Sequence, residues 1–564
     1  MKRYFIVLSI ALAGSLMSYG QSAVDAYSVS QPDLKGTARF MGMAGAFGAL
    51  GGDLSAISVN PGGIGVYRSS DIGFTLDLDL QNSTASDEGR NYTRNQTKFL
   101  LNNIGAVLTM RMPNKTFPNF NFGFTYNKSA SFNRVYGGNI NTLRNSLSNY
   151  IAGVANGEGV TEGDVTTTSS YDPYNPGYND YAAPWLTILG YDSYLITPRV
   201  DPINNTTHWY GQWDNNSMTG QNTSGSGYFL VQEKGAVNDF NIVLGGNINN
   251  VLYWGMNFDI INLNYSLGTI WGENLTKAMV PVEGNDFVRE TSEWSLHNVY
   301  SVSGTGFNYQ LGFIFKPVQS FRLGFAFHTP TWYNLNEQFG ASVNYLYGGT
   351  ESGTVTANDG YLGTNSYNFR TPWKVIASAA AVLGSNFILS FDYEWANYGT
   401  MRFSEENYYD DYDWWGPYSP NYYQDFINSN DPYAYENSDI ATYYKSSNTF
   451  RIGAEFKPTP SFSIRAGYSY VSSPVKKDVK NNQEIIYTAG TQPSYRFDNS
   501  TNYITCGLGY RYQHIYVDLA YVYKHMGSTY HAYTPDPANT QMPSPQSKLS
   551  LNNNQVVLSL GYRF

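Results

Sequence analysis

The residues nearest the N-terminus that could do chemistry form a glycine-rich run over residues 36–63, which contains Asp53 and closes on Asn60, Pro61 and Gly62. Glycine at roughly every third position is typical of loops that cradle nucleotide phosphates. Such loops follow a strand and end in Lys followed by Ser or Thr. This run has neither feature, so we reject nucleotide binding.

The same run predicts a compact structural segment instead. Asp53 is placed to cap a short helix over residues 54–59, and Pro61 with the glycines after it would end that helix. Asn60 can support this stop through a side-chain hydrogen bond. Small residues at this density let the backbone pack closely against another surface.

Acid–base chemistry has one candidate group, His328 with Asp392 and Glu394. Strand alternation would turn all three side chains inward, but no nucleophile is paired with them in the sequence. We therefore expect no catalytic residues and no enzyme activity. The histidines are scattered, and the single Cys506 excludes an internal disulfide and a cysteine-cluster metal site. No metal or other cofactor is expected.

Basic residues form the third candidate group, because strand direction places several of them inward near one mouth of a barrel. They are Arg111, Arg322, Arg465 and Arg511, with Lys457 and Arg563 beside them. One hypothesis is a basic ring that pairs with wall acids or with Asp53 and guides a carboxylate. The alternative is a ladder of ion pairs that only stiffens the lumen.

The elements that would position these groups are strands. The chain ends with Val556, Leu558, Leu560 and Tyr562 on one face and closes on Phe564, as outer-membrane barrels do. Thirteen further segments alternate in the same way. The fourteen are residues 72–80, 104–111, 120–126, 240–248, 252–260, 307–315, 321–327, 369–383, 387–395, 450–456, 462–470, 504–512, 515–523 and 556–564.

The connections support a closed barrel. Those after even-numbered segments are short, such as Asn249-Asn250, whereas those after odd-numbered segments are long, and the longest covers about residues 133–237. Short periplasmic turns that alternate with long extracellular loops follow the barrel rule. We therefore predict an all-β fold, a 14-stranded antiparallel transmembrane barrel over residues 71–564.

Composition and the N-terminus indicate the compartment. Charged residues are 14% and aromatic residues 16% of the chain, and the mean hydropathy is -0.37. Lys2 and Arg3 precede an apolar stretch, so residues 1–20 read as a signal peptide that is cut before Gln21. Without those two cations, 32 basic residues face 44 acidic ones, a net charge of -12. Nucleic-acid binding is therefore not expected, and we predict the outer membrane of a Gram-negative bacterium.

Two local features complete the sequence-based prediction. Residues 21–70 precede the first strand, and side chains alone cannot fill so wide a barrel, so this segment is expected to plug the lumen. In the sixth strand the apolar face changes from even to odd positions near Gly304 and Gly306. We predict a β-bulge there, which curves the wall or opens it locally.

The glycine-rich run, Asp53 and Asn60-Pro61 ahead of the first strand resemble the FadL/TodX outer-membrane transporters of long-chain fatty acids and aromatic hydrocarbons. The family motif usually reads Asn-Pro-Ala, and this chain has Gly62 in the third place. The resemblance implies a hatch with Asp53, Asn60, Pro61 and Gly62 as gating residues. It also implies uptake of a long-chain fatty acid or another hydrophobic ligand, with sideways release after the hatch shifts.

The resemblance further implies a monomer that contacts outer-membrane lipid and depends on the barrel assembly machinery. An alternative remains, because barrels of the PorV type in type IX secretion are similar to the same family. Those barrels bind protein cargo instead of passing small ligands.

Overall fold

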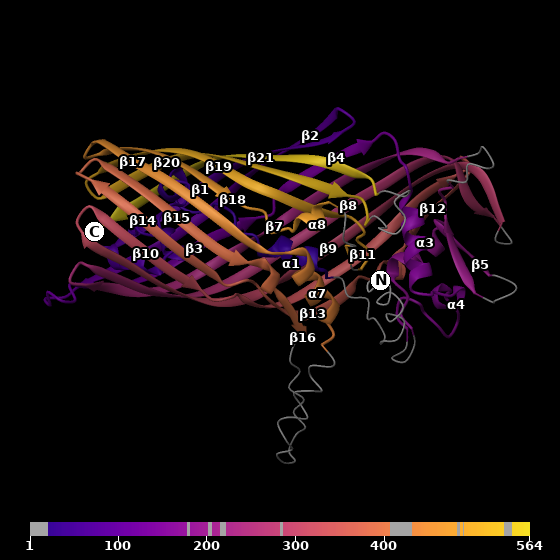
Figure 1. Cartoon of the computed structure of the whole chain (residues 1–564), viewed down its shortest axis with the longest axis horizontal. Helices are drawn as coiled ribbons and strands as arrows, with labels where there is room; N and C mark the ends of the chain where they lie inside the picture. Colours follow the sequence, from indigo (N-terminus) through magenta and orange to yellow (C-terminus); the bar gives the residue numbers. More distant parts are fainter. Residues whose placement is uncertain are drawn as a thin grey trace, which may run out of the picture.

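A computed structural model of the chain describes residues 21–176, 181–200, 206–214, 222–282, 286–405, 431–481, 486–488, 490–534 and 544–564. The predicted signal peptide, residues 1–20, lies outside these described residues. The strands form one large antiparallel sheet that closes on itself, because β1 (Asp71–Asp87) pairs with both β2 (Arg90–Arg111) and β21 (Gln546–Arg563). Figure 1 shows this barrel from the side.

Fourteen strands make the wall, which confirms the predicted fold class. Between β2 and β21 they run in the order β3 (Asn119–Ser131), β7 (Ser224–Ile248), β8 (Leu252–Val282), β9 (Asp286–Val318), β10 (Phe321–His328), β14 (Lys374–Leu383), β15 (Phe387–Asn397), β17 (Ser446–Thr459), β18 (Phe462–Val471), β19 (Tyr495–Tyr512) and β20 (Ile515–His531).

The two ends of the barrel differ. At one end lie short turns, such as Asn249-Asn250, where both residues take the left-handed backbone conformation that a tight hairpin requires. The chain terminus is fastened at this same end, where Phe564 and Ser70 exchange backbone hydrogen bonds of 3.0 and 2.9 Å. We assign this end to the periplasm, because short turns and chain ends lie there in outer-membrane barrels.

Side chains alternate across the wall as the sequence predicted. Apolar side chains such as Ile72, Phe122 and Leu508 face outward and are exposed. Polar side chains between them, such as Asp77 and Asn121, face inward and are buried. The outward apolar side chains contact lipid, and the inward polar side chains find hydrogen-bond partners inside the barrel. No helix among the described residues is long and apolar enough to cross a membrane.

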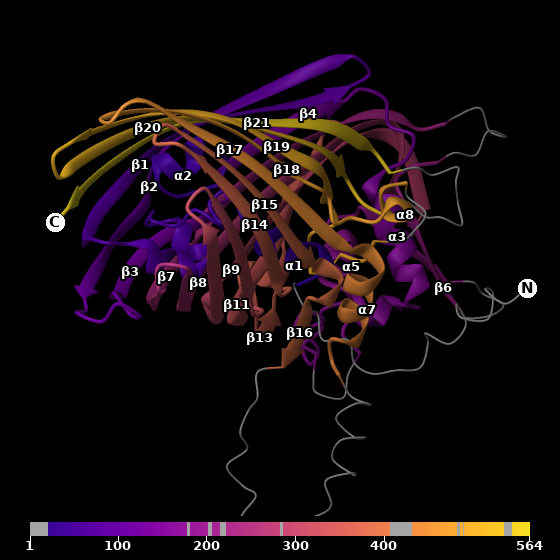
Figure 2. The ribbon, with the colours of Figure 1, turned by 60° about the vertical axis from the view of Figure 1, so that its left-hand side comes forward.

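The wall rises far beyond the membrane on one side, since β7, β8 and β9 span 25, 31 and 33 residues where about 9–11 suffice to cross a bilayer. Between β3 and β7 the chain folds into β4 (Arg134–Ile140), α3 (Leu147–Gly157), α4 (Glu162–Val165), α5 (Trp185–Asp192), β5 (Ile196–Val200) and β6 (Thr207–Gly211). Because β7 begins at Ser224, the last part of the predicted loop is strand. Figure 2 shows α3 and α5 at the extracellular end.

The extracellular half of the barrel holds an apolar core. Trp209 and Ile188 from the segment between β3 and β7 pack in one cluster with Trp271 of β8 and Trp294 of β9. Two short helices, α7 (Ala434–Tyr443) and α8 (Lys477–Lys480), also contribute buried side chains to it. The upper lumen is therefore packed with side chains like a protein interior.

This core explains an error in the prediction for β9. Even-numbered residues face inward along the whole strand, from Trp294 to Asn308, and the register with β8 and β11 is unbroken at Gly304 and Gly306. The predicted bulge is therefore wrong. The strand itself is regular. Its inward-facing residues are apolar in the extracellular half, where they contact the apolar core, and polar in the periplasmic half, where they contact polar groups.

Three neighbouring strands are interrupted at one level of the wall. β10 gives way to β11 (Trp332–Tyr347) at residues 329–331, β13 (Gly363–Arg370) gives way to β14 at residues 371–373, and β15 gives way to β16 (Arg402–Glu405) through the 3-10 turn η5 (Tyr398–Thr400). The predicted eighth strand, residues 369–383, is thus two strands. A proline follows a threonine at the first two breaks, and proline cannot donate to a sheet ladder.

Above this break the sheet divides. β11 pairs with β9, β12 (Glu351–Thr356) and β13, and β13 pairs with β16. The turn η4 (Ala357–Gly360) follows β12. β15 pairs with β17 only as far as Asn397 and Ser446, and within the described residues β16 pairs with β13 alone. The wall therefore parts between β16 and β17, and α7 contacts β16 and η5 there.

Candidate functional site: the N-terminal segment and the cavity above it

Residues 21–70, called the N-terminal segment below, lie inside the barrel (Figures 1 and 2). They form α1 (Ala23–Ser30), α2 (Ala38–Gly42) and two 3-10 turns, η1 (Ala56–Ser58) and η2 (Pro61–Val66). Ser22 caps α1 and shares a capping box with Asp25, and Thr37 caps α2. The segment is compact because glycines and turns end each helix after a few residues and let the chain fold back on itself.

Glycines on the wall allow the N-terminal segment to lie backbone against backbone. Gly245, Gly255 and Gly312 stand in one inward-facing row across β7, β8 and β9. The backbone of Pro61 and Gly62 lies on this row, and a Cβ atom on Gly62 would come within 2.9 Å of the Gly312 backbone. On the other side, Gly467 of β18 would place a Cβ atom 2.5 Å from the carbonyl carbon of Met43.

Polar contacts fasten the segment around the barrel. Both the Phe47 and the Gly48 backbone N–H groups donate to the Asp392 carboxylate on β15 at 2.9 Å. Asn60 donates to the carbonyl oxygens of Gly48 at 2.6 Å and of Phe313 at 3.1 Å, and its own oxygen accepts from the Gly62 N–H group at 2.9 Å. Asn60 therefore caps η2 and also ties it to the wall.

Asp53 has a different role from the one expected. Its carboxylate accepts from the Thr37 hydroxyl at 2.8 Å and from the Ser55 N–H group at 2.9 Å. The helix predicted over residues 54–59 is only the 3-10 turn Ala56–Ser58. Asp53 thus joins the two halves of the N-terminal segment, because Thr37 itself caps α2.

A fully buried ionic triad joins the segment to β1. Lys35 Nζ lies 2.6 Å from Asp77 and 3.2 Å from Asp79 on β1, with the Lys35 side chain fully buried. It also donates to the Gln555 side chain on β21 at 2.8 Å. Burial opposes the charge of Lys35, but the two carboxylates outweigh it and raise the pKa of the ammonium group. Lys35 therefore stays charged inside the barrel.

Asp33 adds a second ion pair between the segment and the wall. It lies 3.0 Å from Lys524 Nζ on β20 and accepts from the Tyr503 hydroxyl at 2.8 Å. Burial alone would raise the pKa of Asp33, but the cations of Lys524 and Lys35 and the Tyr503 hydrogen bond lower it to about 2. Asp33 is thus ionised at every physiological pH.

The predicted basic residues lie near the periplasmic mouth but do not form a single ring. Arg465 is buried between Glu455 at 2.7 Å and Asp518 at 2.6 Å. Arg322 donates to the Leu50 carbonyl at 2.9 Å and Arg111 to the Arg68 carbonyl at 3.2 Å. Arg511 is exposed at the turn end of β19. A guiding role for any of them stays a prediction, since three of the four already hold protein groups.

Two of the three candidate acid–base residues, His328 and Asp392, bind the N-terminal segment. His328 Nε2 donates to the Val59 carbonyl at 3.0 Å, Asp392 accepts the two amides described above, and Glu394 pairs with Arg451 at 2.7 Å. These contacts give each side chain a partner other than a nucleophile.

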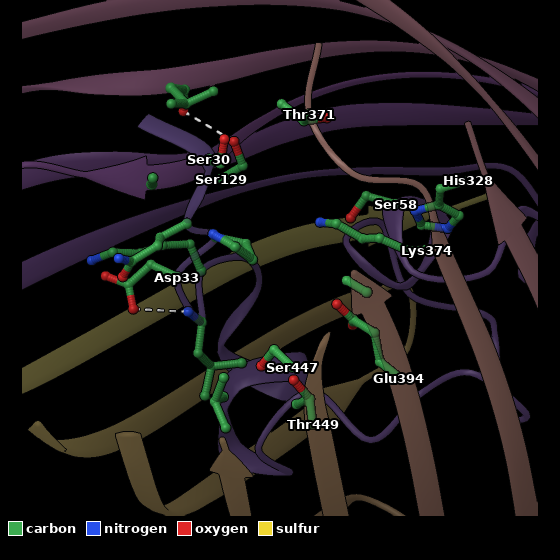
Figure 3. Close-up of a pocket in the computed structure, with 18 of the residues that line it drawn as sticks. Ser30, Asp33, Ser58, Ser129, His328, Thr371, Lys374, Glu394, Ser447 and Thr449 are labelled. Atoms are coloured by element: carbon green, nitrogen blue, oxygen red, sulfur yellow. Dashed lines mark hydrogen bonds between the residues drawn. The ribbon is translucent and has the colours of Figure 1, made fainter. Parts of the chain in front are cut away.

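A cavity of about 240 Å³ lies between the N-terminal segment and the apolar core. Figure 3 shows its lining from several elements, with Ser58 of the segment beside His328 and Lys374 of the wall. Its apolar lining includes Tyr27, Val29, Val237, Ile261, Tyr333, Ile376, Tyr398 and Met526. The cavity also reaches the break in the wall, since Thr371, Pro372 and Ser447 line it.

Lys374 is the distinctive charged group of this cavity. Its side chain extends into the space between Ser58 and Glu394 (Figure 3), and it makes no ion pair within 4 Å among the described residues. Of the other cations that line the cavity, Lys35, Arg451 and Lys524 are paired with carboxylates. Lys128 donates to the Asn238 side-chain oxygen at 3.0 Å. Asp239 and Asp259 also line the cavity, and hydrogen bonds from Ser129 and Asn308 hold them.

Sequence reasoning did not identify Lys35 or Lys374. A signal for Lys374 existed, because it continues the inward, even-numbered face of β14. Lys35 gave no signal, since it precedes the glycine-rich run in a segment without periodicity.

The closed wall and the outward apolar band define an integral barrel protein of the Gram-negative outer membrane. The family model described as outer membrane protein transport protein (OMPP1/FadL/TodX) matches residues 214–564, more than half of the chain. The chain therefore belongs to the FadL/TodX family. The match begins after the N-terminal segment and after most of the insertion between β3 and β7.

One solved structure supports the fold. A FadL homologue of Pseudomonas aeruginosa is 12% identical with a TM-score of 0.50, over 94% of this chain and 99% of that one. The toluene transporter TbuX of Ralstonia pickettii is 12% identical with a TM-score of 0.46, and the P. putida toluene transporter TodX is 13% identical with a TM-score of 0.45; both cover 94% of this chain and 99% of theirs. No curated protein matches the chain. Members of this family are channels for hydrophobic substrates.

Proposed function

We propose that this barrel takes up an amphipathic hydrophobic ligand with an anionic head group, a long-chain fatty acid, and that the N-terminal segment gates it. The ammonium group of Lys374, which forms no ion pair with the residues that the structure describes, lies in a cavity with many apolar side chains, and this observation carries the proposal. A carboxylate against Lys374 would form a charge-assisted hydrogen bond, and the acyl chain would extend along side chains such as Ile376 and Tyr398.

The size of the cavity supports a gated step. About 240 Å³ is below the roughly 300–1,000 Å³ of sites for drug-sized ligands. A long acyl chain would fit only after the N-terminal segment moves, since residues from Tyr27 to Val59 form one side of the cavity. In this proposal Asp53, Asn60, Pro61 and Gly62 are gating residues that hold the segment in its closed position.

Replacing Lys374 tests the head group. We expect Lys374→Met to weaken oleate binding about tenfold or more, because hydrogen bonds to charged groups contribute roughly 1.5–3 kcal/mol. Toluene, which has no charge, should bind both proteins equally. Isothermal titration of the detergent-purified barrel gives both affinities, and Lys115→Met, in an exposed periplasmic turn, is the matched control.

Equal oleate affinity of the wild type and Lys374→Met would refute the fatty-acid proposal and favour a neutral hydrocarbon. Native mass spectrometry of the purified barrel distinguishes a transporter from a barrel that binds protein cargo in secretion. A barrel that binds neither ligand but retains a protein partner would support the secretion shuttle.

We further propose that the ligand leaves sideways through the part of the wall between β16 and β17. The cavity reaches this gap in the wall. A single side chain covers the gap through hydrogen bonds that can break and form again. Asn437 of α7 accepts from the Phe403 N–H group at 2.8 Å and donates to the Phe403 carbonyl at 3.0 Å. Its amide thus replaces the strand that β16 lacks on that edge.

Removing this amide should loosen the seal. We expect Asn437→Ala to expose the Phe403 backbone, at a cost of about 1–3 kcal/mol for unsatisfied groups, and to accelerate oleate release. Hydrogen exchange at Phe403 and stopped-flow dissociation measure the two effects. Asn344→Ala on β11, away from the gap, should change neither. Faster exchange without faster release would show that the ligand leaves by another path.

A further inference from the structure

A groove of about 910 Å³ lies on the outer, membrane-facing side of the wall, where β8, β9, β11, β13 and β16 run side by side. One row of outward side chains crosses its length in strict register. The row reads Ile260, Phe307, Trp332, Arg370 and Arg402. At about 4.8 Å per strand the row spans roughly 19 Å, and it is apolar at one end and cationic at the other.

The apolar end is a platform of aromatic rings. Phe307 lies 5.4 Å from Trp332 and 6.1 Å from Tyr309, between ring centroids, and Tyr309 lies 5.2 Å from Phe258. Ile260, Phe307, Tyr309 and Trp332 are each 38–50% exposed. Such a concave apolar surface within the lipid band accommodates acyl chains.

The cationic end is unusual for its position. Arg370 and Arg402 stand directly opposite each other on neighbouring strands, and like charges in this arrangement are destabilising. Arg402 pairs with Asp431 at 2.9 Å and is still 56% exposed, and Arg370 has no ion pair among the described residues. The chain as a whole is acidic, with a net charge of -10. An anion between the two guanidinium groups would remove the repulsion.

The height of the groove indicates its occupant. The row lies at the upper edge of the apolar band, because the next outward row is Asn334, Asn368 and Ser404. That edge meets the head groups of the outer leaflet. On its inner side the groove is closed from the lumen by the buried Tyr333 and Phe369, whose rings stack 6.4 Å apart.

We propose that this groove is a binding site for an anionic, phosphate-bearing lipid of the outer leaflet. The phosphate lies between Arg370 and Arg402, whose planar guanidinium groups suit bidentate phosphate contacts. The acyl chains lie over Trp332, Phe307 and Ile260. A free phosphate would leave the aromatic platform uncovered, so the observations favour the lipid.

Native mass spectrometry of the full barrel in mild detergent tests the site, with diphosphoryl lipid A as the probe. The double substitution Arg370→Gln and Arg402→Gln should weaken retention of this lipid about tenfold or more. Arg94→Gln, an exposed arginine on β2 outside the groove, should have no effect. Arg370→Lys, which keeps the charge, should restore part of the binding, and Trp332→Ala should weaken it through the acyl chains alone.

Two results would overturn the proposal. One is equal retention of diphosphoryl lipid A by the wild type and the double variant. The other is oleate binding that depends on Arg370 and Arg402 while lipid A binding does not, which would assign the groove to the transport route. Weak retention of dephosphorylated lipid A by the wild type would support the phosphate contact. Heat-modifiable mobility in electrophoresis checks that every variant is a folded barrel.

Discussion

Lys35→Met is expected to release the N-terminal segment from the barrel wall. Lys35 is fully buried between Asp77 at 2.6 Å and Asp79 at 3.2 Å. Removal of one partner from a buried ion pair costs about 3–5 kcal/mol, because the remaining charge has no compensation. The equilibrium for docking of the segment should therefore shift roughly 10²–10⁴-fold.

Two measurements follow this release. Single-channel recording in planar bilayers should show ion conductance that the wild type lacks, and limited proteolysis should cleave the N-terminal segment sooner. The triple variant with Lys35→Met, Asp77→Asn and Asp79→Asn removes the stranded charges and should recover most of the closed state. A silent, protease-resistant Lys35→Met barrel would mean that the triad contributes little to closure.

Gly255→Ala is expected to displace the N-terminal segment by steric contact alone. The added Cβ atom would stand inside van der Waals distance of the Pro61 carbonyl group, which is backbone and cannot rotate away. Overpacking of this kind costs about 1–3 kcal/mol, and more where backbone must shift. Because β8 is held on both sides by β7 and β9, the N-terminal segment must move.

The same strand supplies the control for this experiment. A Cβ atom on Gly268 of β8 would meet no heavy atom within 4 Å, so Gly268→Ala changes the strand without touching the segment. Conductance and oleate uptake into reconstituted vesicles should increase for Gly255→Ala and stay at the wild-type level for Gly268→Ala. If both variants behave alike, close backbone packing on the glycine row is not what seats the segment.

The two predictions concern different contacts of one segment. Lys35 fastens the segment to β1, whereas Gly255 permits its approach to β8. If Lys35→Met and Gly255→Ala both increase conductance, the whole N-terminal segment moves as one gate, as proposed for Asn60 and Pro61. If only Lys35→Met increases conductance, the gate consists of the residues near α1.

The sequence predicted the wall well because the forces that shape it are local. Each outward residue meets lipid and each inward residue meets polar groups, so an alternation of period two appears in segments such as residues 556–564. The turns were equally clear, since Asn249 and Asn250 both adopt the left-handed conformation that their side chains tolerate. Fourteen strands and their order followed from these two signals.

The bulge predicted at Gly304 failed for a related reason. The rule that inward residues are polar holds only where the interior is polar. Around Trp294 and Leu296 the interior is an apolar core to which α3 and α5 contribute, and both helices lie more than a hundred residues away in the sequence. The sequence of one strand does not record what faces it across the lumen.

By itself, then, the sequence determined the class of the protein, its compartment and its strand count, and it led to the proposal of a plug over residues 21–70. Tertiary structure alone decided that Lys35 meets Asp77 and Asp79, that Lys374 points into a cavity without an ion pair to any described residue, and that the wall parts beside β16. Each of these depends on which distant segments are brought together. Alternation fixes the face on which a side chain lies, whereas its partner is fixed only when the barrel closes around the N-terminal segment.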